Sequence, residues 1–264
     1  MRRMRRPIWI VLVVVVGGIA ATAFATFASG LDRLALWRVV ETCVADFELT
    51  GAPFPCLEVS LSGGDERGDV VLRPPLLRDL IVAPTRRVVG VEDPYLQSPG
   101  APPYFEAAWR ARSFLEGPGG RTPERDEIAL VANSALVRSQ DQLHIHVGCL
   151  APSFRRALAA AAPQAPIGEW ARIGGVAPHA MLWGMRVKGP DLSGIHPFPL
   201  AARAFADKVG DRRNLTIAVA GVRVEGDDQF LILASYAQAP GPWLPLASSD
   251  LLDRSCASKS RASG

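Results

Sequence analysis

The sequence predicts an α+β fold, a mainly antiparallel sheet with flanking helices, preceded by one transmembrane helix. Strand-like apolar runs come in consecutive pairs, as in hairpins, and segments with apolar residues at helical spacing separate these pairs. An uncharged run of 25 residues precedes them near the N-terminus. The 264 residues, 48% hydrophobic and 21% charged, are enough for one large or two small globular units.

The uncharged run, residues 7–31, predicts a membrane anchor that follows a basic tail, residues 1–6. About 20 apolar residues suffice to cross a bilayer. The four arginines of the tail favour a cytoplasmic N-terminus and a translocated body. The alternative is a cleaved signal peptide, because Ala21-Thr22-Ala23 has the small-x-small form. Both interpretations place the body across the membrane.

The charge balance gives no indication of nucleic-acid binding. The formal net charge is +3, but the four arginines of residues 1–6 contribute +4, so the rest of the chain carries −1. A nearly neutral body lacks the basic surface that binds phosphate backbones. We therefore expect no nucleic-acid partner.

The four cysteines predict disulfide bonds, because an even number in an exported body is typical of them. A bond between Cys43 and Cys56 would close a short loop, and it would leave Cys149 with Cys256. Three connectivities are possible, and four free thiols are the alternative.

The segment 32–150 predicts two helices and five strands. Residues 32–47 have apolar side chains at helical spacing with an Asp near the start, and residues 104–116 form an amphipathic pattern. The strands are expected at 57–61, 69–73, 79–85, 127–134 and 141–150. The eight residues 135–142, between the cores of the last two strands, suit a hairpin with a functional loop.

The segment 151–256 predicts a second set of the same kind, and the tail 257–264 is expected to be disordered. Helices are expected at 152–163 and 197–209, and strands at 179–187, 215–224 and 227–236. Residues 228–234 resemble 141–147, and 218–221 resemble 130–133. This similarity suggests a degenerate internal duplication, and the alternative is two unrelated hairpins of similar composition.

Two histidines, His144 and His146, stand one residue apart in the predicted strand 141–150. Alternate strand residues share a face, so these histidines and Gln142 are expected on one side. In the second set, leucines stand at both histidine positions, at Leu231 and Leu233.

Three uses of the pair are open. A metal site needs a third ligand and usually a fourth, while the other histidines, His179 and His196, are distant in Pro- and Gly-rich sequence. A purely structural pair is the second possibility. The third is nucleophilic attack on phosphorus, in which a neutral imidazole forms a covalent intermediate. Such a site needs polar groups around the phosphoryl oxygens, and Asn133, Arg138 and Ser139 are nearby in the chain.

The motif "VANS…RSQDQLHIHVGC" resembles the histidine triad (HIT) superfamily, in which a strand ends in Asn before a polar loop and alternating histidines. More closely, the chain resembles the CDP-diacylglycerol pyrophosphatase family. That likeness includes the N-terminal anchor, Cys43 followed by "PFPC", "VAPTRRVVGVEDP", the "AAWRAR" helix and the late Cys256.

The resemblance implies a HIT-like fold and hydrolysis of CDP-diacylglycerol to CMP and phosphatidate through a phosphohistidine, without a metal or another cofactor. His144 matches the nucleophile and His146 the group near the phosphoryl oxygens and leaving group. Asn133 matches the Asn that helps to hold the nucleotide. The substrate-binding group also includes Arg138, Ser139 and Arg87, which match less specifically.

One position departs from the triad, because Gln142 stands where the family has its first histidine. A glutamine can orient a neighbour by hydrogen bonds but does not titrate near neutral pH. We still count Gln142 among the catalytic residues.

The predicted domains are a catalytic HIT-like half, residues 32–150, and a degenerate half, residues 151–256. HIT proteins are commonly dimers, so an internal second copy would allow a monomer with an intramolecular pseudo-dimer. The expected location is the bacterial inner membrane, with a single span and the body on the periplasmic or outer side. The expected partners are the bilayer and its CDP-diacylglycerol. Alternatives are a tethered pyrophosphatase for soluble CDP-alcohols or nucleotide sugars, and a non-enzymatic metal-binding module.

Overall fold

The computed structural model describes residues 32–75, 79–117, 120–177, 179–209, 211–237 and 244–253. The predicted basic tail, the predicted anchor 7–31 and the predicted disordered tail 257–264 lie outside these ranges. None of the helices in the described part of the chain is long and apolar enough to span a bilayer.

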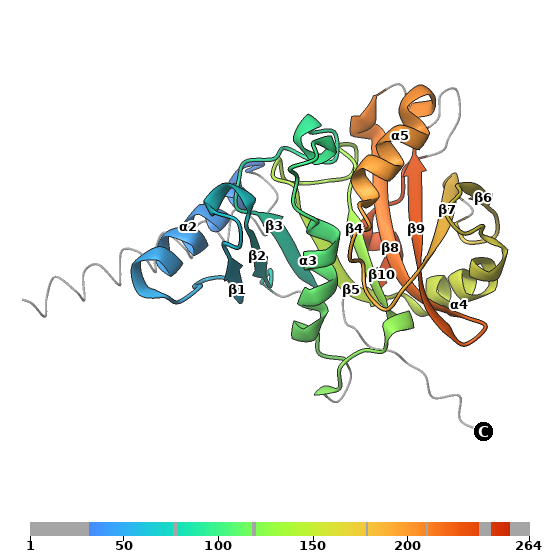
Figure 1. Cartoon of the computed structure of the whole chain (residues 1–264), viewed down its shortest axis with the longest axis horizontal. Helices are drawn as coiled ribbons and strands as arrows, with labels where there is room; N and C mark the ends of the chain where they lie inside the picture. The colour runs from blue at the N-terminus through green and yellow to red at the C-terminus, as the bar shows by residue number, and fades with distance from the viewer. Residues whose placement is uncertain are drawn as a thin grey trace, which may run out of the picture.

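A single sheet organises the described residues, with the order β1-β2-β3-β5-β4-β8-β9-β7-β6 and β10 beside β5 (Figure 1). Every pairing between these strands is antiparallel, which confirms the predicted α+β class with an antiparallel sheet. The strands are β1 (Glu58–Ser60), β2 (Asp69–Leu72), β3 (Leu80–Pro84), β4 (Ile128–Ala132), β5 (Ile145–Leu150), β6 (Ala171–Ile173), β7 (Leu182–Lys188), β8 (Leu215–Val224), β9 (Asp227–Tyr236) and β10 (Leu252–Asp253).

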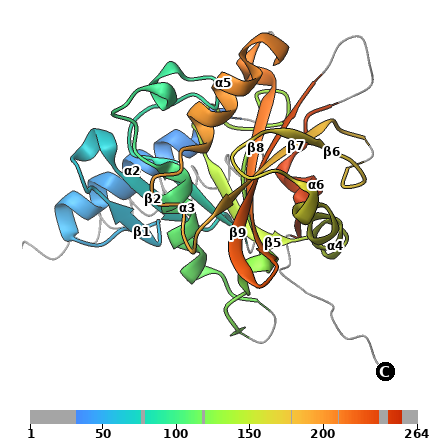
Figure 2. The same ribbon diagram turned by 45° about the vertical axis from the view of Figure 1, so that its right-hand side comes forward.

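Helices cover both faces of this sheet. The helices are α2 (Ala35–Thr50), α3 (Tyr104–Ala111), α4 (Pro152–Ala161), α5 (Pro197–Val209) and α6 (Ser248–Leu251). The helices α3 and α5 pack on one face and share one apolar core (Figures 1 and 2). On the opposite face, α2 packs over β1, β2 and β3, and α4 and α6 pack over β4, β8 and β9.

The opposite face therefore carries two separate apolar clusters, which meet at β5, whose last residue, Leu150, belongs to the α4 cluster. His146 has Ile81 of the α2 cluster as one cross-strand neighbour and Val131 of the α4 cluster as the other. We call this position on β5 the seam. A polar side chain can lie there without interrupting either cluster.

Local sequence signals set the ends of α2. The Oδ1 atom of Asp32 accepts a hydrogen bond from the backbone N–H of Leu34 at 2.9 Å. Gly51 ends the helix in the left-handed region, at φ 75°, where its N–H bonds the Phe47 carbonyl. The helix thus runs three residues later at both ends than the predicted range 32–47.

A disulfide bond joins Cys43 of α2 to Cys56, thirteen residues later. This bond ties α2 to the segment that enters β1. Cys149 is disulfide-bonded as well, and Cys256 lies outside the described residues.

The hairpin predictions succeed in the second half and fail partly in the first. Strands β8 and β9 have the predicted bounds. The predicted strand 141–150 is wrong in its first four residues, because β5 begins at Ile145. The chain before it folds as a loop, in which Leu143 donates its N–H to the Val88 carbonyl at 2.6 Å.

Two parts of the sheet have the same strand order. The first is β3-β5-β4 with α3 before β4, and the second is β7-β9-β8 with α5 before β8. The predicted match of 130–133 with 218–221 is wrong by one residue. Leu130 lies on the α3/α5 face, whereas Ala218 lies on the opposite face. The neighbouring residue Ile217 lies on the same face as Leu130 and is the better match for it.

Candidate active site

His144 lies immediately before β5 and is only 5% exposed. Its Nδ1 is 2.7 Å from the carbonyl oxygen of Gln142. A carbonyl only accepts hydrogen bonds, so Nδ1 carries the hydrogen and Nε2 keeps a lone pair. Burial, and next the neighbouring His146, lower the pKa of His144 to about 3. The ring is therefore neutral near pH 7, with an unprotonated Nε2.

His146 follows on β5, at the seam. The two imidazole rings are edge to face, with centroids 5.0 Å apart. The Nδ1 atom of His146 is 3.3 Å from Oδ2 of Asp79, and its Nε2 is 3.5 Å from Nδ2 of Asn133. The ring is thus held from both sides, next to the candidate nucleophile.

Asn133 follows β4 and is held by Ser248 of α6. Its Oδ1 accepts the backbone N–H of Ser248 at 2.8 Å, and its Nδ2 donates to Oγ of Ser248 at 3.1 Å. These two bonds fix which end of the amide faces His146. The C-terminal half of the chain therefore contributes to the site through Ser248.

Gln142 is fully buried, and its amide bonds the last residue of β3 and the segment that follows. Its Nε2 donates to the carbonyls of Pro84, at 3.0 Å, and Arg86, at 2.9 Å. Its Oε1 accepts the backbone N–H of Val88 at 3.3 Å. The side chain holds that loop, while its backbone carbonyl fixes the tautomer of His144.

Arg138 is also directed into the protein. Its side chain is 6% exposed and makes two hydrogen bonds of 2.7 Å with Glu92. It also bonds Asp141, which receives two further bonds of 2.7 Å from Arg33. Hydrogen bonds from Arg33, and then from Arg138, lower the pKa of Asp141 to about 2. Arg138 therefore organises the loop, whereas Ser139 is exposed.

Arg87 is exposed beside this loop. Its guanidinium donates to the backbone carbonyl of Asp141 and to Oε1 of Gln142. The structure thus brings Arg87 into the same polar loop as Gln142, with part of its guanidinium accessible.

Sequence reasoning missed Asp79 and Ser248. Both lie far from the histidines along the chain, so no local spacing indicated them. One signal was available for Asp79: a glycine, Gly148, stands two residues after His146 on the same face of β5. A Cβ atom at Gly148 would lie 3.2 Å from Cβ of Asp79. The glycine thus leaves room for the carboxylate.

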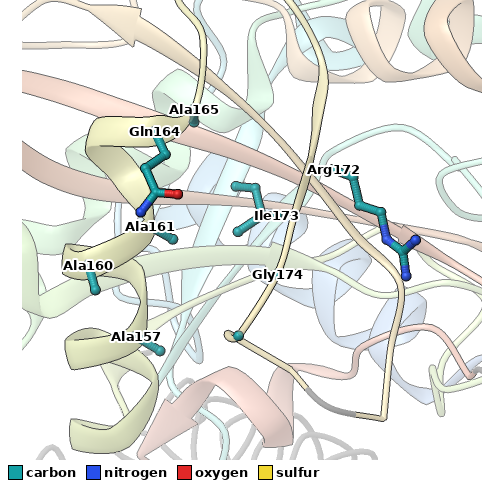
Figure 3. A pocket seen from close by; sticks show the side chains of 9 residues that line it. Ala157, Ala160, Ala161, Gln164, Ala165, Arg172, Ile173 and Gly174 are labelled. Atoms are coloured by element: carbon teal, nitrogen blue, oxygen red, sulfur yellow. The ribbon is translucent and has the colours of Figure 1, made fainter.

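A hollow in the described surface lies elsewhere, between α4 and the segment containing β6 (Figure 3). Its lining is mostly small residues, with Gln164 and Arg172 at its margins. None of the predicted site residues contributes to it.

The metal interpretation has no third ligand in the described part of the chain, where no three His, Cys, Asp or Glu side chains form a metal-binding group. His179 is in an exposed loop near Asp250, and His196 lies before α5.

Comparison with known proteins identifies the family of the chain. The family model described as CDP-diacylglycerol pyrophosphatase matches residues 31–260. A CDP-diacylglycerol pyrophosphatase of Yersinia pestis is 31% identical over 210 residues, which cover 77% of this chain and 76% of the relative. A probable CDP-diacylglycerol pyrophosphatase of Mycobacterium leprae (strain TN) is 35% identical over 126 residues, which cover 47% of this chain and 46% of the relative. The chain therefore belongs to the CDP-diacylglycerol pyrophosphatase family.

Proposed function

We propose that this chain hydrolyses CDP-diacylglycerol to CMP and phosphatidate, with His144 as the nucleophile. Membership of the family supports the hydrolysis and the substrate. One observation carries the mechanism: the buried His144 gives its Nδ1 hydrogen to the Gln142 carbonyl and keeps a free Nε2 lone pair. A nucleophile needs its tautomer fixed in this way before it can attack phosphorus.

In the first step, Nε2 of His144 attacks the phosphorus of the cytidylyl group. A nitrogen–phosphorus bond forms, the anhydride bond breaks, and phosphatidate leaves with the bridging oxygen. In the second step, water attacks the same phosphorus, the nitrogen–phosphorus bond breaks, and CMP is released. Two displacements replace one difficult step.

Other residues support these steps in different ways. His146 lies next to the nucleophile, and Asn133 contacts the Nε2 side of the His146 ring. Arg87 and Ser139 are exposed at the loop and can bind the outer phosphate. Gln142 and Arg138 act as positioning residues, because their polar atoms are bonded to the surrounding loops.

We also infer that the fold is a HIT-like unit duplicated within one chain, with residues 32–150 as the catalytic half and 151–256 as the degenerate half. The shared order of β3-β5-β4 and β7-β9-β8 supports this, as does the position of α3 and α5 on one face. In this register His146 corresponds to Leu233. A pseudo-dimer within one chain is consistent with a monomeric enzyme.

The proposed location is the bacterial inner membrane, with residues 7–31 as the span and the body outside the cytoplasm. The run directly precedes Asp32, where the described chain begins. A lipid with two acyl chains stays in the bilayer, so a tethered enzyme would meet its headgroup at the membrane surface.

The test is hydrolysis by the full-length chain in detergent–lipid micelles that contain CDP-diacylglycerol, in water labelled with heavy oxygen. We expect CMP and phosphatidate, with the label in CMP only. His144→Ala should abolish this activity, whereas the control His179→Ala, an exposed loop histidine, should retain it. Preference for soluble CDP-alcohols over the lipid would contradict the proposed substrate, and an active His144→Ala would contradict the mechanism.

A further inference from the structure

Asp79 is a buried carboxylate that contacts His146. It immediately precedes β3 and is 5% exposed, and its Oδ2 lies 3.3 Å from Nδ1 of His146. Its other oxygen, Oδ1, has no hydrogen-bond partner among the described residues. A buried carboxylate with one engaged oxygen needs a specific reason to be there.

The local sequence makes room for this carboxylate. Gly148 is opposite Asp79, and a Cβ at that glycine would lie 3.2 Å from both Cβ of Asp79 and Cδ1 of Leu252. A larger residue at this position would be tightly packed against the side chains of Asp79 and Leu252. The pairing of β3 with β5 therefore brings Asp79 to His146, and Gly148 leaves space for the Asp79 side chain.

The hydrogen bonds around His146 indicate the roles of its two ring nitrogens. Oδ1 of Asn133 is held by the Ser248 N–H, so the Nδ2 hydrogens of Asn133 face Nε2 of His146. An atom that faces an N–H donor is an acceptor, while Nδ1 donates to the Asp79 carboxylate. In this arrangement Nε2 of His146 is the acceptor nitrogen, so it is the atom that can take up a proton.

The chemistry of the proposed reaction needs a base in its second step. The leaving phosphatidate is a phosphate monoester with a second pKa of about 6, so it can depart as an anion without receiving a proton. Attacking water, by contrast, must lose a proton. His146 stands beside His144, with ring centroids 5.0 Å apart, where it can receive that proton.

We propose that Asp79 is a positioning residue that holds His146 as the general base for hydrolysis of the cytidylyl-His144 intermediate. This inference rests on the proposed function. Water forms an oxygen–phosphorus bond, its proton goes to Nε2 of His146, and the bond electrons return to Nε2 of His144. The Asp79 carboxylate stabilises the imidazolium that forms, through the Nδ1 hydrogen bond. The proton then passes to solvent.

The test is rapid-quench kinetics of the full-length Asp79→Asn variant with CDP-diacylglycerol, following phosphatidate and CMP separately. We expect a burst of phosphatidate close to one equivalent per enzyme, with a rate constant within about threefold of the wild type. CMP release should then fall on the order of 10²-fold, so that cytidylyl-His144 accumulates. The matched control is Asp69→Asn, which removes a partly buried carboxylate on the neighbouring strand β2, and it should show no burst.

A second variant keeps the test decisive if Asp79→Asn is poorly folded. His146→Gln removes the base itself and should give the same burst followed by slow CMP release. Equal slowing of both steps in the folded variants would overturn the proposal, because a merely structural role affects both. Unchanged CMP release would overturn it as well. Failure of the proposed function would look different, since no covalent intermediate would form in any variant and His144→Ala would stay active.

Discussion

The two halves of the sheet share a strand order but differ in what surrounds their central strand, which is β5 in the first half and β9 in the second. In the first half, His146 lies at the seam, between a residue of the α2 cluster and a residue of the α4 cluster. In the second half, Leu233 lies between Ala218 and Gly184 and is buried in the α4 cluster itself. The comparison teaches that the site depends on a break in the apolar cover of one sheet face.

The connections between the paired strands differ as well. Strands β8 and β9 are joined by a tight turn at Glu225 and Gly226, both with positive φ. Strands β4 and β5 are joined by residues 133–144, in which Arg138 bonds Glu92 and Asp141, and Gln140 accepts a hydrogen bond from the start of α2. This polar loop orients His144, and the second half has no room for an equivalent.

The largest effect is expected from exchanging the central residues of the two halves. His146→Leu should lower turnover by a factor on the order of 10² or more, because the proposed base is lost, while stability should not fall. Leu233→His should leave the chemistry intact but lower the free energy of unfolding by about 2–4 kcal/mol, because it buries an unpaired imidazole. Steady-state kinetics and urea unfolding measure both. A stable Leu233→His protein would show that the second half tolerates a polar residue there.

Loss of the Cys43–Cys56 disulfide should destabilise the part of the molecule that has no counterpart in the second half. Closing a loop of this size contributes about 3 kcal/mol in the chain-entropy model. The double variant Cys43→Ser with Cys56→Ser should therefore unfold at lower urea concentration. Unchanged stability of the double variant relative to the wild type would contradict this expectation.

The buried His144 should make stability fall in mild acid. Its pKa is lowered to about 3 in the folded chain, mainly by burial, whereas an unfolded histidine has a pKa of 6.5. The contribution of the neutral, buried His144 to the free energy of unfolding is therefore complete above pH 6.5, and it is lost as the pH falls towards 3. Between pH 7 and pH 5 the expected loss is about 2 kcal/mol. The variant His144→Gln should lack this pH-dependent loss of stability, because glutamine does not titrate, as is also true of Leu231 at the equivalent position in the second half. Identical profiles of stability against pH for the wild type and the variant would contradict the assignment of this loss to His144.

The smallest effect is expected from Ser248→Ala. The variant loses the Oγ acceptor of the Asn133 amide but retains the backbone N–H that holds Asn133 Oδ1. A neutral hydrogen bond contributes about 1 kcal/mol, so activity should fall several-fold at most. Asn133→Ala should cost more, because both bonds and the contact with His146 disappear. Equal losses in the two variants would mean that Ser248 acts on the substrate directly.

The sequence predicts most of the second half and less of the first for a physical reason. Strands β8 and β9 each contain a long apolar run, and a tight turn joins them, so their pattern indicates their extent. The alternating pattern of residues 141–147 continues through Gln142 and His144, but those side chains are recruited by the loop after β3 and by a backbone carbonyl. Periodicity cannot reveal such long-range hydrogen bonds.

The same limit applies to the site. The pair His144 and His146, with Asn133, follows from local spacing and from the family motif. Asp79 and Ser248 reach the site because β3 pairs with β5 and because α6 packs beside β4. Only the assembled sheet brings these residues together, and only Gly148 offered a local sign of it.

The most direct test of the central claim is to quench the full-length enzyme with CDP-diacylglycerol within one turnover and to map the cytidylyl group by mass spectrometry under alkaline conditions. The account predicts an acid-labile adduct on the peptide that contains His144, absent in His144→Ala and increased in Asp79→Asn. An adduct on another residue, or complete hydrolysis with no adduct in either the wild type or Asp79→Asn, would contradict it.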